Sequence, residues 1–590
     1  MLFGKHINKY YLRFAPMLIL GLVALIVVDY FQLLIPEIYR SVINGISDGY
    51  VISDGVRYDF NLEFLLDKIC LPMIFVIVFM VVGRFVWRVC FFGSAIKVET
   101  DLRCRMFDRC KDLSQSYYQV NKVGNLMSLF TNDLKTIEEC FGSGILSLLD
   151  AVMLGFLALF KMFRMDYVLT LLSLIPMSLL IVVATIVRKY MMKKWTARQE
   201  AFSALSDFSQ ESFSGIAVIK AFVKEAKELW SFKKLNKKNE DANVDHTRAS
   251  TLLHIFVTLF VESVICVIIG YGGYLVYNGE FNAGEFVEFI GYFNAIVWPI
   301  MAISQLIEMQ SRGRASLNRI SALLDAEIDV CDKEGAFDIT NVKGDIEFKS
   351  LTFRHPGASY DALRNVSLRI NAGERVGIIG KTGAGKTTMV DLILRTYNIP
   401  SGMLFVDGVD VNDVTIKSLR KHCAYVPQDN FLFSDSIENN ISFATDESSL
   451  SFEEAAKLAD IHGNIVEFSK GYQTVLGERG VTVSGGQKQR ISIARALMKD
   501  APILILDDSV SAVDTKTEKV ILENLHKLRQ GKTTILIAHR VSTIEGMDKI
   551  VYIDDGEVVD IGTHDELYTR CVSYRNMVEL QRLDEEKEGM

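Results

Sequence analysis

Closely spaced cysteines are absent from the sequence. Its nine cysteines are scattered over 590 residues and no C-x-x-C pair occurs, so we expect neither a zinc site nor a disulfide framework. Positive charge is not in excess either: the net charge is −8, which argues against nucleic acid as a partner. No cleavable signal peptide is evident, because the first apolar run is too long and no small-residue cleavage pattern follows it.

Apolar residues, by contrast, are abundant. They make up 49% of the chain and mean hydropathy is +0.22. A chain in which one half spans a membrane and the other half is soluble would have such average values. A chain of this length exceeds one hydrophobic core, so we expect at least two domains. Six apolar segments are long enough to cross a membrane as helices; they lie near residues 14–38, 68–93, 141–163, 165–187, 250–277 and 285–307.

The distribution of Lys and Arg between these segments predicts their orientation. Residues 94–139 carry seven and residues 188–248 carry thirteen, whereas 41–66 has only Arg57 and 278–285 has none. The positive-inside rule therefore places both termini in the cytoplasm. The two long basic connections have helical patterns, so we expect the membrane helices to extend into the cytoplasm as stalks.

Several ionisable residues fall inside or near the apolar segments. They are Asp29, Arg84, Arg88, Asp150, Glu262 and Glu308. Such groups are costly in a membrane and usually face a cavity or a partner. Two interpretations remain open: contact with a polar or charged substrate, or structural pairing near the interface, where Arg84 and Arg88 would extend toward water.

Residues 309–343 lose the apolar period and gain charge. We therefore predict a helical transmembrane domain over 1–330, a linker over 331–343 and a second domain over 344–590. In the second domain apolar runs typical of buried strands alternate with helical patterns, as expected for an α/β fold. After Gln428 a mostly helical stretch interrupts this alternation of strands and helices.

A glycine-rich loop in the second domain predicts nucleotide binding. The sequence G-x-x-x-x-G-K-T follows the apolar run 375–379 and precedes a helical pattern at 388–394, which is the strand–loop–helix context this motif needs. Backbone N–H groups and the helix N-terminus would hold phosphates, Lys386 would reach the β- and γ-phosphates, and the Thr387 hydroxyl would hold Mg²⁺. The predicted ATP-binding residues are Gly380, Lys381, Thr382, Gly383, Ala384, Gly385, Lys386, Thr387 and Thr388.

Further motifs follow in a specific order. Gln428 is followed by Val483-Ser-Gly-Gly-Gln487, by the strand Ile503-Leu-Ile-Leu-Asp507, by Ser511-Ala-Val-Asp514 and by His539 at the end of another apolar run. With these motifs, nearly the whole chain resembles an ABC transporter half of the exporter type. The resemblance implies an all-α six-helix transmembrane domain followed by an α/β P-loop ATPase domain with a helical subdomain.

The resemblance also implies roles for single residues. Asp507, Thr387 and Gln428 would bind Mg²⁺, while Asp508, His539 and Gln428 would be catalytic and His355 would contact adenine. The loop Gly477–Gly480 precedes the signature motif, and residues 117–121 and 213–222 would dock on the ATPase domain. The signature residues would contact the ATP of a second subunit, which implies a dimer; they are Ser484, Gly485, Gly486 and Gln487, with Asp514.

Three positions depart from the family pattern. Asp508 replaces the usual Glu, and its shorter side chain would cost much of the 10²–10⁴ that general-base catalysis typically contributes, unless a small backbone shift restores the contact. His355 replaces the usual Tyr, and Val483 replaces Leu. A weak catalytic site beside an intact signature resembles one subunit of a heterodimeric bacterial multidrug exporter; a homodimer remains the alternative.

We therefore predict ATP-driven export of a small hydrophobic or amphipathic substrate across the bacterial plasma membrane, in contact with membrane lipids. Lipid or peptide export is the alternative within the same class. An ATP-gated channel is a second class. The lack of a long regulatory insert between the two halves of the chain argues against it. The six apolar segments argue against a third class, a soluble ATPase subunit of an importer or a DNA-repair enzyme.

Overall fold

The computed structural model describes residues 3–53, 56–445, 448–477, 480 and 483–588. The chain divides into two compact units. The first, called the membrane unit, holds residues 1–108 and 126–325; the second, called the nucleotide unit, holds residues 109–125 and 326–590.

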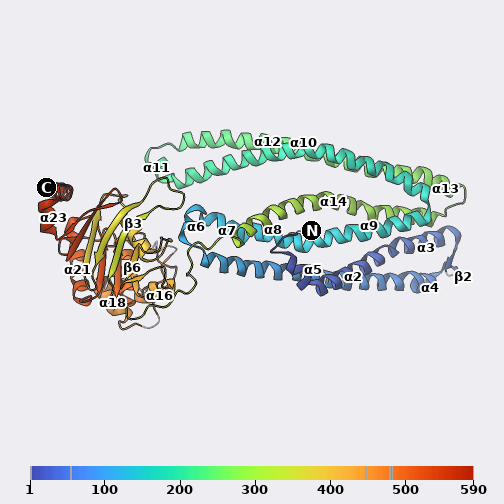
Figure 1. The fold of residues 1–590 in the computed structure, drawn as a ribbon. Helices are drawn as coiled ribbons and strands as arrows, with labels where there is room; N and C mark the ends of the chain where they lie inside the picture. The colour runs from blue at the N-terminus through green and yellow to red at the C-terminus, as the bar shows by residue number, and fades with distance from the viewer. Residues whose placement is uncertain (1–2, 54–55, 446–447, 478–479, 481–482, 589–590) are drawn as a thin grey trace. The chain divides into compact units, whose positions relative to one another are not determined.

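The membrane unit consists almost wholly of helices (Figure 1). They are α1 (Asn8–Arg13), α2 (Ala15–Gln32), α3 (Leu34–Asp48), α4 (Leu62–Phe64), α5 (Leu71–Asp112), α8 (Leu134–Glu139), α9 (Ile145–Met165), α10 (Tyr167–Ser214), α11 (Ile216–Ala221), α12 (Glu225–Val267), α13 (Gly273–Tyr277) and α14 (Ala283–Leu324), and a small antiparallel hairpin joins β1 (Tyr50–Ser53) to β2 (Val56–Asp59). The first predicted segment is interrupted at Leu33, because Pro36 has no N–H to donate to the carbonyl of Gln32.

Five helical stretches in the described part of the chain are long and apolar enough to cross a membrane. They are Ala15–Asp48, Leu62–Asp112, Val123–Met165, Glu225–Tyr277 and Ala283–Leu324. The sixth predicted segment, 165–187, falls in α10; its apolar helix Tyr167–Leu179 is shorter, and several side chains beyond it lie outside the described set.

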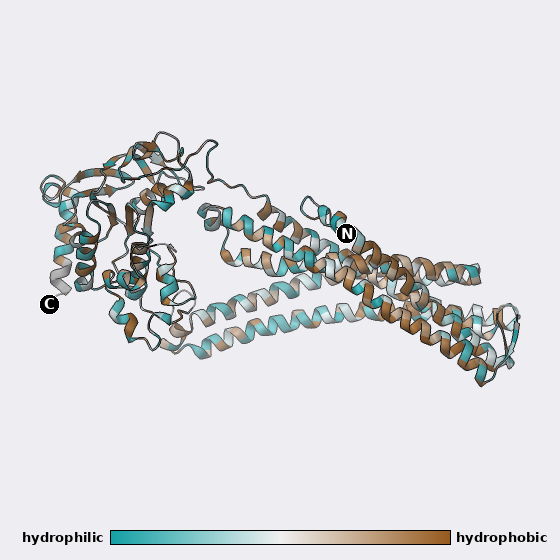
Figure 2. Cartoon of the chain, turned by 90° about the horizontal axis from the view of Figure 1, so that it is seen from below, coloured by the Kyte–Doolittle hydropathy of each residue, from teal (hydrophilic) through white to brown (hydrophobic). Residues whose placement is uncertain are grey.

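The long helices of this unit exceed the thickness of a membrane. Helices α10 and α12 contain 48 and 43 residues, which at 1.5 Å per residue is roughly 70 and 65 Å, against about 30 Å for the hydrocarbon core. They run side by side (Figure 1). Figure 2 shows hydrophobic residues along one part of the long helices and more hydrophilic residues along the rest, as expected for helices that continue beyond the membrane.

The nucleotide unit contains two sheets. A six-stranded sheet has the order β12-β11-β5-β10-β9-β8, parallel except for β12, and a four-stranded antiparallel sheet has the order β4-β3-β6-β7. The strands are β3 (Ile346–Phe353), β4 (Leu363–Ile370), β5 (Arg375–Gly380), β6 (Leu404–Val406), β7 (Val409–Asp410), β8 (Cys423–Val426), β9 (Ile503–Asp507), β10 (Thr533–Ile537), β11 (Lys549–Asp554) and β12 (Glu557–Gly562).

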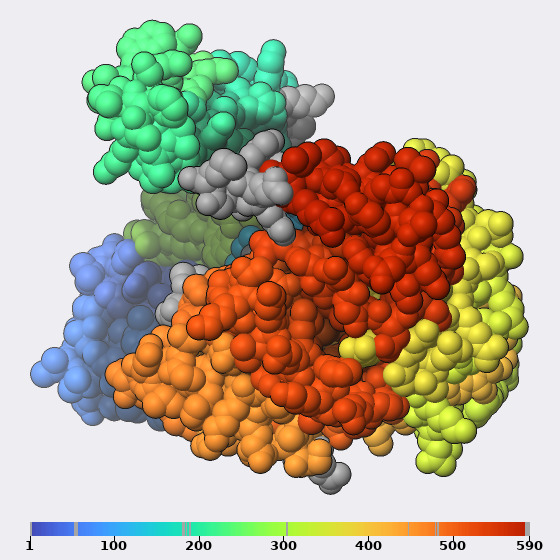
Figure 3. All heavy atoms as spheres, turned by 90° about the vertical axis from the view of Figure 1, so that its left-hand side faces the viewer, coloured from blue at the N-terminus to red at the C-terminus, as the bar shows by residue number. Residues whose placement is uncertain are grey.

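Helices complete this unit, and the second of them runs on into the membrane unit, which resumes at residue 126. They are α6 (Gln115–Val120), α7 (Val123–Ser128), α15 (Lys386–Ile393), α16 (Ile416–Lys421), α17 (Ile437–Ser442), α18 (Phe452–Leu458), α19 (His462–Glu467), α20 (Gly485–Met498), α21 (Thr515–Leu528), α22 (Val541–Ile544), α23 (His564–Arg570) and α24 (Val572–Glu588). Helices α17 to α20 form the helical insertion between β8 and β9. Figure 3 shows the C-terminal residues beside those of the antiparallel sheet on one face.

Alternating residues of the parallel strands face two separate hydrophobic cores. In β9, Leu504 and Leu506 pack into the core shared with α17 to α21, whereas Ile503 and Ile505 pack into the core shared with α15 and the antiparallel sheet. A strand buried on both faces reads as a continuous apolar run, which explains why the sequence predicted this strand at its observed bounds. The two cores fix the carboxyl ends of the parallel strands, where the predicted site residues lie.

Candidate functional site

The predicted site residues come together because they follow neighbouring parallel strands. The glycine-rich loop follows β5, Gln428 follows β8, Asp508 follows β9 and His539 follows β10. The carboxyl ends of the strands of an open α/β sheet form the usual ligand-binding edge.

Glycine is required at both ends of the loop between β5 and α15. A Cβ at Gly380 would lie 1.9 Å from the carbonyl oxygen of Ile553. At Gly385, where φ is +96°, it would lie 2.6 Å from the carbonyl oxygen of Ala362. A positive φ and such close backbone approach both exclude larger residues. The loop is thereby held tight, with its backbone available to an anion at the N-terminus of α15.

Lys386 is buried inside this loop. Its Nζ donates to the carbonyl oxygens of Gly380 and Lys381, each at 2.9 Å, and burial lowers the pKa of the ammonium group. A buried cation whose hydrogen bonds in the described structure go to neutral carbonyls gains from an anionic partner. The position therefore fits phosphate binding.

Asp507 fits a divalent cation. The residue is 1% exposed, its Oδ1 accepts from the Thr387 hydroxyl at 3.3 Å, and burial raises its pKa. Its Oδ2 is buried without a hydrogen-bond partner among the described residues. A carboxylate oxygen left open beside a hydroxyl is the hard-oxygen donor set that Mg²⁺ prefers.

The three predicted catalytic residues form one cluster. The Asp508 Oδ2 atom lies 3.3 Å from Gln428 Nε2 and 3.9 Å from His539 Nε2. The Asp508 backbone has φ +48°, a left-handed conformation that Asp adopts more readily than most residues. Its side chain is 13% exposed, so the carboxylate is held against the wall of the site.

Most of the predicted ATP-site residues line a cavity of about 300 Å³. Its lining includes His355, Thr382, Gly383, Gly385, Lys386, Thr387, Thr388, Gln428, Asp507, Asp508 and His539. Gly380 and Ala384 belong to the same loop, and Lys381 pairs with Asp554 at 2.9 Å.

Tyr360, which was not predicted from the sequence, also lines this cavity and is 72% exposed. His355, predicted to contact adenine, is more constrained. Its Nε2 lies 3.1 Å from the Thr388 hydroxyl, and its ring meets the rings of Phe353 and Tyr397 edge-on with centroids 5.0 Å apart. Tyr360 could have been found from the sequence, because it is an aromatic residue shortly after His355, the position where the family usually has Tyr.

The signature residues lie elsewhere in the nucleotide unit. Ser484 caps α20: its hydroxyl accepts from the N–H of Gln487 at 3.3 Å, and the Gln487 side chain accepts from the N–H of Ser484 at 2.9 Å. Gly485 and Gly486 form the first turn, and Asp514 caps α21. Within the described part of the chain, none of these five lines the cavity around Lys386.

Three further segments were predicted from the sequence: the loop before the signature and two docking segments. Residues 478–479 of the loop before the signature lie outside the described residues. The segment 117–121 belongs largely to α6, which is part of the nucleotide unit, and there Gln119 Nε2 donates to the Tyr397 hydroxyl at 2.7 Å. Because Tyr397 packs against His355, this segment is linked through two side chains to the nucleotide cavity. The segment 213–222 forms the end of α10 and α11.

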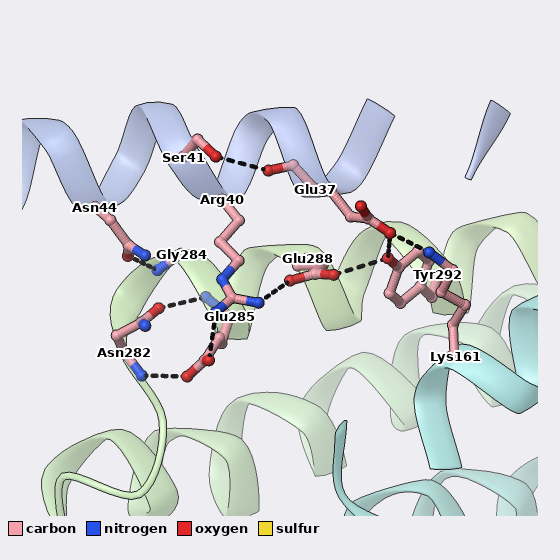
Figure 4. Close-up of polar contacts among 10 residues, drawn as sticks. All are labelled: Glu37, Arg40, Ser41, Asn44, Lys161, Asn282, Gly284, Glu285, Glu288 and Tyr292. Carbon is pink, nitrogen blue, oxygen red and sulfur yellow. Dashed lines mark hydrogen bonds and ion pairs between the residues drawn. The ribbon is translucent and has the colours of Figure 1, made fainter. Parts of the chain in front are cut away.

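A charged network in the membrane unit was not predicted from the sequence (Figure 4). It joins α3, α9 and α14 through Glu37, Arg40, Lys161, Glu285, Glu288 and Tyr292. Arg40 bonds Glu285 at 2.8 Å and Glu288 at 3.2 Å, and the Tyr292 hydroxyl lies 2.7 Å from Glu288 and 3.1 Å from Glu37. Lys161 pairs with Glu37. Each charge therefore has a partner, as intramembrane charges require.

Comparisons with known proteins agree over nearly the whole chain. The family model of the ABC transporter transmembrane region matches residues 18–300, and the ABC transporter model matches residues 363–511. The probable multidrug resistance ABC transporter ATP-binding/permease protein YheI of Bacillus subtilis (strain 168) is 34% identical, covering 99% of this chain and 98% of its own. The multidrug resistance-like ATP-binding protein MdlA of Escherichia coli (strain K12) is 33% identical, covering 96% and 94%.

An ATP-dependent lipid A-core flippase of Syntrophus aciditrophicus (strain SB) is 33% identical, covering 91% of this chain and 89% of its own. A solved bacterial Atm1-family ABC exporter with ATP bound has a TM-score of 0.74 at 24% identity and covers 98% of both chains. These comparisons confirm the predicted fold class of a helical membrane domain followed by an α/β nucleotide-binding domain.

Proposed function

The chain belongs to the ABC transporters as a half-transporter of the exporter type, and from this premise we propose that it is one subunit of a heterodimeric exporter of hydrophobic or amphipathic compounds. As a family member it is a multi-pass membrane protein and an ATPase coupled to transport, which uses ATP with Mg²⁺ and works as a dimer. The substrate class, the asymmetry of the dimer and the residue roles are parts of the proposal.

In the proposed ATP site the nucleotide supplies the phosphoanhydride bond whose cleavage drives transport. The loop from Gly380 to Thr388 holds the phosphates, with Lys386 as the cation. Thr387, Asp507 and Gln428 hold Mg²⁺; support comes from the open Oδ2 of Asp507 beside the Thr387 hydroxyl. We assign the signature residues and Asp514 to the site of the second subunit; in support, none of them belongs to the described lining of this cavity.

Asp508 carries the proposed asymmetry. Its carboxylate is tied to Gln428 and lies near His539, and it is one methylene shorter than Glu. A general base must lie within hydrogen-bond reach of the proton it removes. The shorter side chain therefore gives a slow site in this subunit, while the intact signature of α20 completes a fast site with the partner's phosphate loop.

One experiment separates a heterodimer from a homodimer. The tagged chain is purified from its native membrane, its stoichiometric partner is identified by mass spectrometry, and ATP hydrolysis is measured for two variants. In a heterodimer, Asp508→Asn lowers hydrolysis about twofold at most, whereas Ser484→Ala lowers it more than about tenfold because the partner's site loses a phosphate contact. Equal losses, or a complex of two identical chains, would contradict the proposal.

Lipid export is the second candidate function, because the lipid A-core flippase matches most of this chain. Reconstituted complexes can be compared for ATP-dependent movement of a fluorescent phospholipid and of a lipophilic dye. Faster dye transport favours the multidrug function, and faster lipid movement favours the flippase function.

We also place the protein in a bacterial plasma membrane with both termini in the cytoplasm. Support for this orientation comes from the excess of Lys and Arg at 94–139 and 188–248 over the short connections at 41–66 and 278–285.

A further inference from the structure

Of the six ionisable residues that the sequence places in or near the apolar segments, Glu262 alone has no neighbour of opposite charge among the described residues. Its carboxylate makes neither a hydrogen bond nor an ion pair with them. Glu308 pairs with Arg312 at 3.7 Å. The remaining four line one cavity of the membrane unit, where two arginines lie among two carboxyl groups; they are Asp29, Arg84, Arg88 and Asp150.

Glu262 lies near the middle of the apolar part of α12. That part, residues 250–277, contains no other Asp, Glu, Lys or Arg. At 1.5 Å per residue, Glu262 is roughly 18 Å from its start and roughly 22 Å from its end, which is well inside a hydrocarbon core of about 30 Å. A carboxylate at this depth is costly in lipid and belongs beside a partner or a water-filled cavity.

The side chain of Glu262 does not face the core of its own unit. Helix α12 packs into that core through Val257, Val261, Val264 and Ile268, which follow one another at helical spacing. Glu262 lies outside this stripe and is exposed. The partner that the carboxylate requires is therefore not found in the described core of the membrane unit.

The helix that runs beside α12 offers no counter-charge at this level either. Lys194 of α10 pairs with Asp245 of α12, and Leu169 of α10 lies next to Gly272, shortly after α12. The two helices are thus antiparallel, and Glu262 lies opposite the stretch 167–187 of α10. This stretch contains no Asp, Glu, Lys or Arg.

Glu262 belongs to a polar wall that has only one side. A depression of about 540 Å³ on the surface of the membrane unit is lined by side chains of a single helix; they are His254, Ile255, Thr258, Leu259, Glu262, Ser263 and Cys266 of α12. This described lining contains no Lys or Arg. Because the family works as a dimer, such a wall is incomplete until the second subunit faces it.

We propose that Glu262 lines the transport pathway between the two subunits and recognises the cationic group of an amphipathic organic ammonium substrate. The ammonium N–H groups donate to the carboxylate, while Ile255 and Leu259 contact the apolar body of the substrate. A charge-assisted hydrogen bond is stronger than a neutral one, which favours a cation over a neutral compound of the same shape. This inference names the substrate class of the exporter and so rests on the proposed function.

The test uses two probes with the same ring system and opposite charge. 9-Aminoacridine is a cation at neutral pH and acridine-9-carboxylate is an anion. Binding to the full-length complex is measured by fluorescence anisotropy without nucleotide, in nanodiscs of phosphatidylcholine, a lipid without net charge. We expect the unmodified complex to bind the cation at least about tenfold more tightly than the anion. Equal affinities, tighter anion binding or no binding of the cation would overturn the proposal.

Substitutions then locate the site. Glu262→Gln keeps the shape of the side chain and removes its charge, so it should weaken cation binding about tenfold and leave anion binding no weaker. Glu262→Asp should restore part of the cation affinity. The matched control is Glu308→Gln, which removes an exposed acid of α14 and should leave cation binding unchanged.

Three results with these variants would overturn the proposal. Unchanged cation affinity in Glu262→Gln would place the cation elsewhere. An equal loss in Glu262→Gln and Glu308→Gln would show a general effect of charge, and an equal loss of cation and anion binding in Glu262→Gln would show that Glu262 supports the contact between subunits.

The probe comparison on the unmodified complex keeps the proposal testable if Glu262→Gln does not fold, which thermal unfolding would reveal. Because binding is measured without nucleotide, failure of the proposal is distinguishable from failure of the proposed function. The latter would appear as absent ATP-dependent transport by the unmodified complex.

Discussion

At the scale of single residues, the nucleotide cavity offers two side chains that could stack on a base. His355 is held by Thr388, Phe353 and Tyr397, whereas Tyr360 is exposed in the lining. We expect Tyr360→Ala to weaken ATP binding by about 1–3 kcal/mol, the usual contribution of a base–aromatic stack, and His355→Ala to weaken it less. The measurement is equilibrium binding of a fluorescent ATP analogue to the full-length protein.

Tyr360→Phe is the control for this comparison, because it keeps the ring and removes only the hydroxyl. It should bind the analogue as the unmodified protein does. A larger loss in His355→Ala than in Tyr360→Ala would instead assign the base contact to His355.

Asp391 in α15 gives a pH-dependent prediction. Burial, and then the nearby Asp507 carboxylate, raise its pKa from 3.8 to about 6. Between these values the folded state binds the proton more tightly than the unfolded state, so this group's contribution to stability falls as pH rises. Asn cannot ionise, and Asp391→Asn should raise the melting temperature of the nucleotide unit by roughly 2–4 °C at pH 8 and by little at pH 4.

The control for this prediction is Asp435→Asn. Hydrogen bonds from Asn439 and Ser436 lower the pKa of Asp435, so its ionised form favours folding above its ordinary pKa. This substitution should not raise the melting temperature at pH 8. A gain for Asp391→Asn that is equal at pH 4 and pH 8 would show that the gain does not come from ionisation.

At the scale of elements, the C-terminal helix α24 holds the segment that carries His539. The Gln581 side-chain amide donates to the carbonyl oxygen of His539 at 2.7 Å, and its Oε1 accepts from the N–H of Val541 at 2.8 Å. Removing both bonds in Gln581→Ala should lower kcat for ATP hydrolysis by the complex about twofold at most, as expected for Asp508→Asn in the same site, while KM changes little, because a misplaced catalytic group costs rate rather than binding.

Leu580→Ala changes the neighbouring exposed residue of α24 and should leave both constants unchanged. An effect of Gln581→Ala on KM alone would mean that α24 supports nucleotide binding and not the position of His539. The steady-state assay on the full-length complex therefore separates a positioning role from a general loss of structure.

The elements also show how far the sequence determines the structure. Strands β5, β9 and β10 were predictable because strands buried on both faces read as short apolar runs, and the polar residues that follow them must share one sheet edge. The break at Leu33 and the hairpin of β1 and β2 were not predicted. The network of Arg40 and Glu288 was not predicted either, and these two residues are 248 positions apart in the sequence. Such pairs depend on which helices pack together, and the periodicity within one segment carries no information about helix packing.

At the scale of the whole molecule, the distribution of charge and hydropathy predicts orientation. The hairpin of β1 and β2 lies in a connection with a single Arg, whereas the middle of the sequence from α10 to α12 carries thirteen Lys and Arg over residues 188–248. The positive-inside rule places the first outside the cell and the second in the cytoplasm. Single cysteines at these places, in a background without the native cysteines, test the assignment.

We expect a membrane-impermeant maleimide to label Asp59→Cys in intact cells. Lys233→Cys in α12 should be labelled only after the membrane is permeabilised. Both positions are exposed, so access to the reagent depends on the side of the membrane and not on burial within the protein. Labelling of Lys233→Cys in intact cells together with protection of Asp59→Cys would reverse the orientation. It would also place the nucleotide unit outside the cell, away from cytoplasmic ATP, in conflict with an ATPase that drives export.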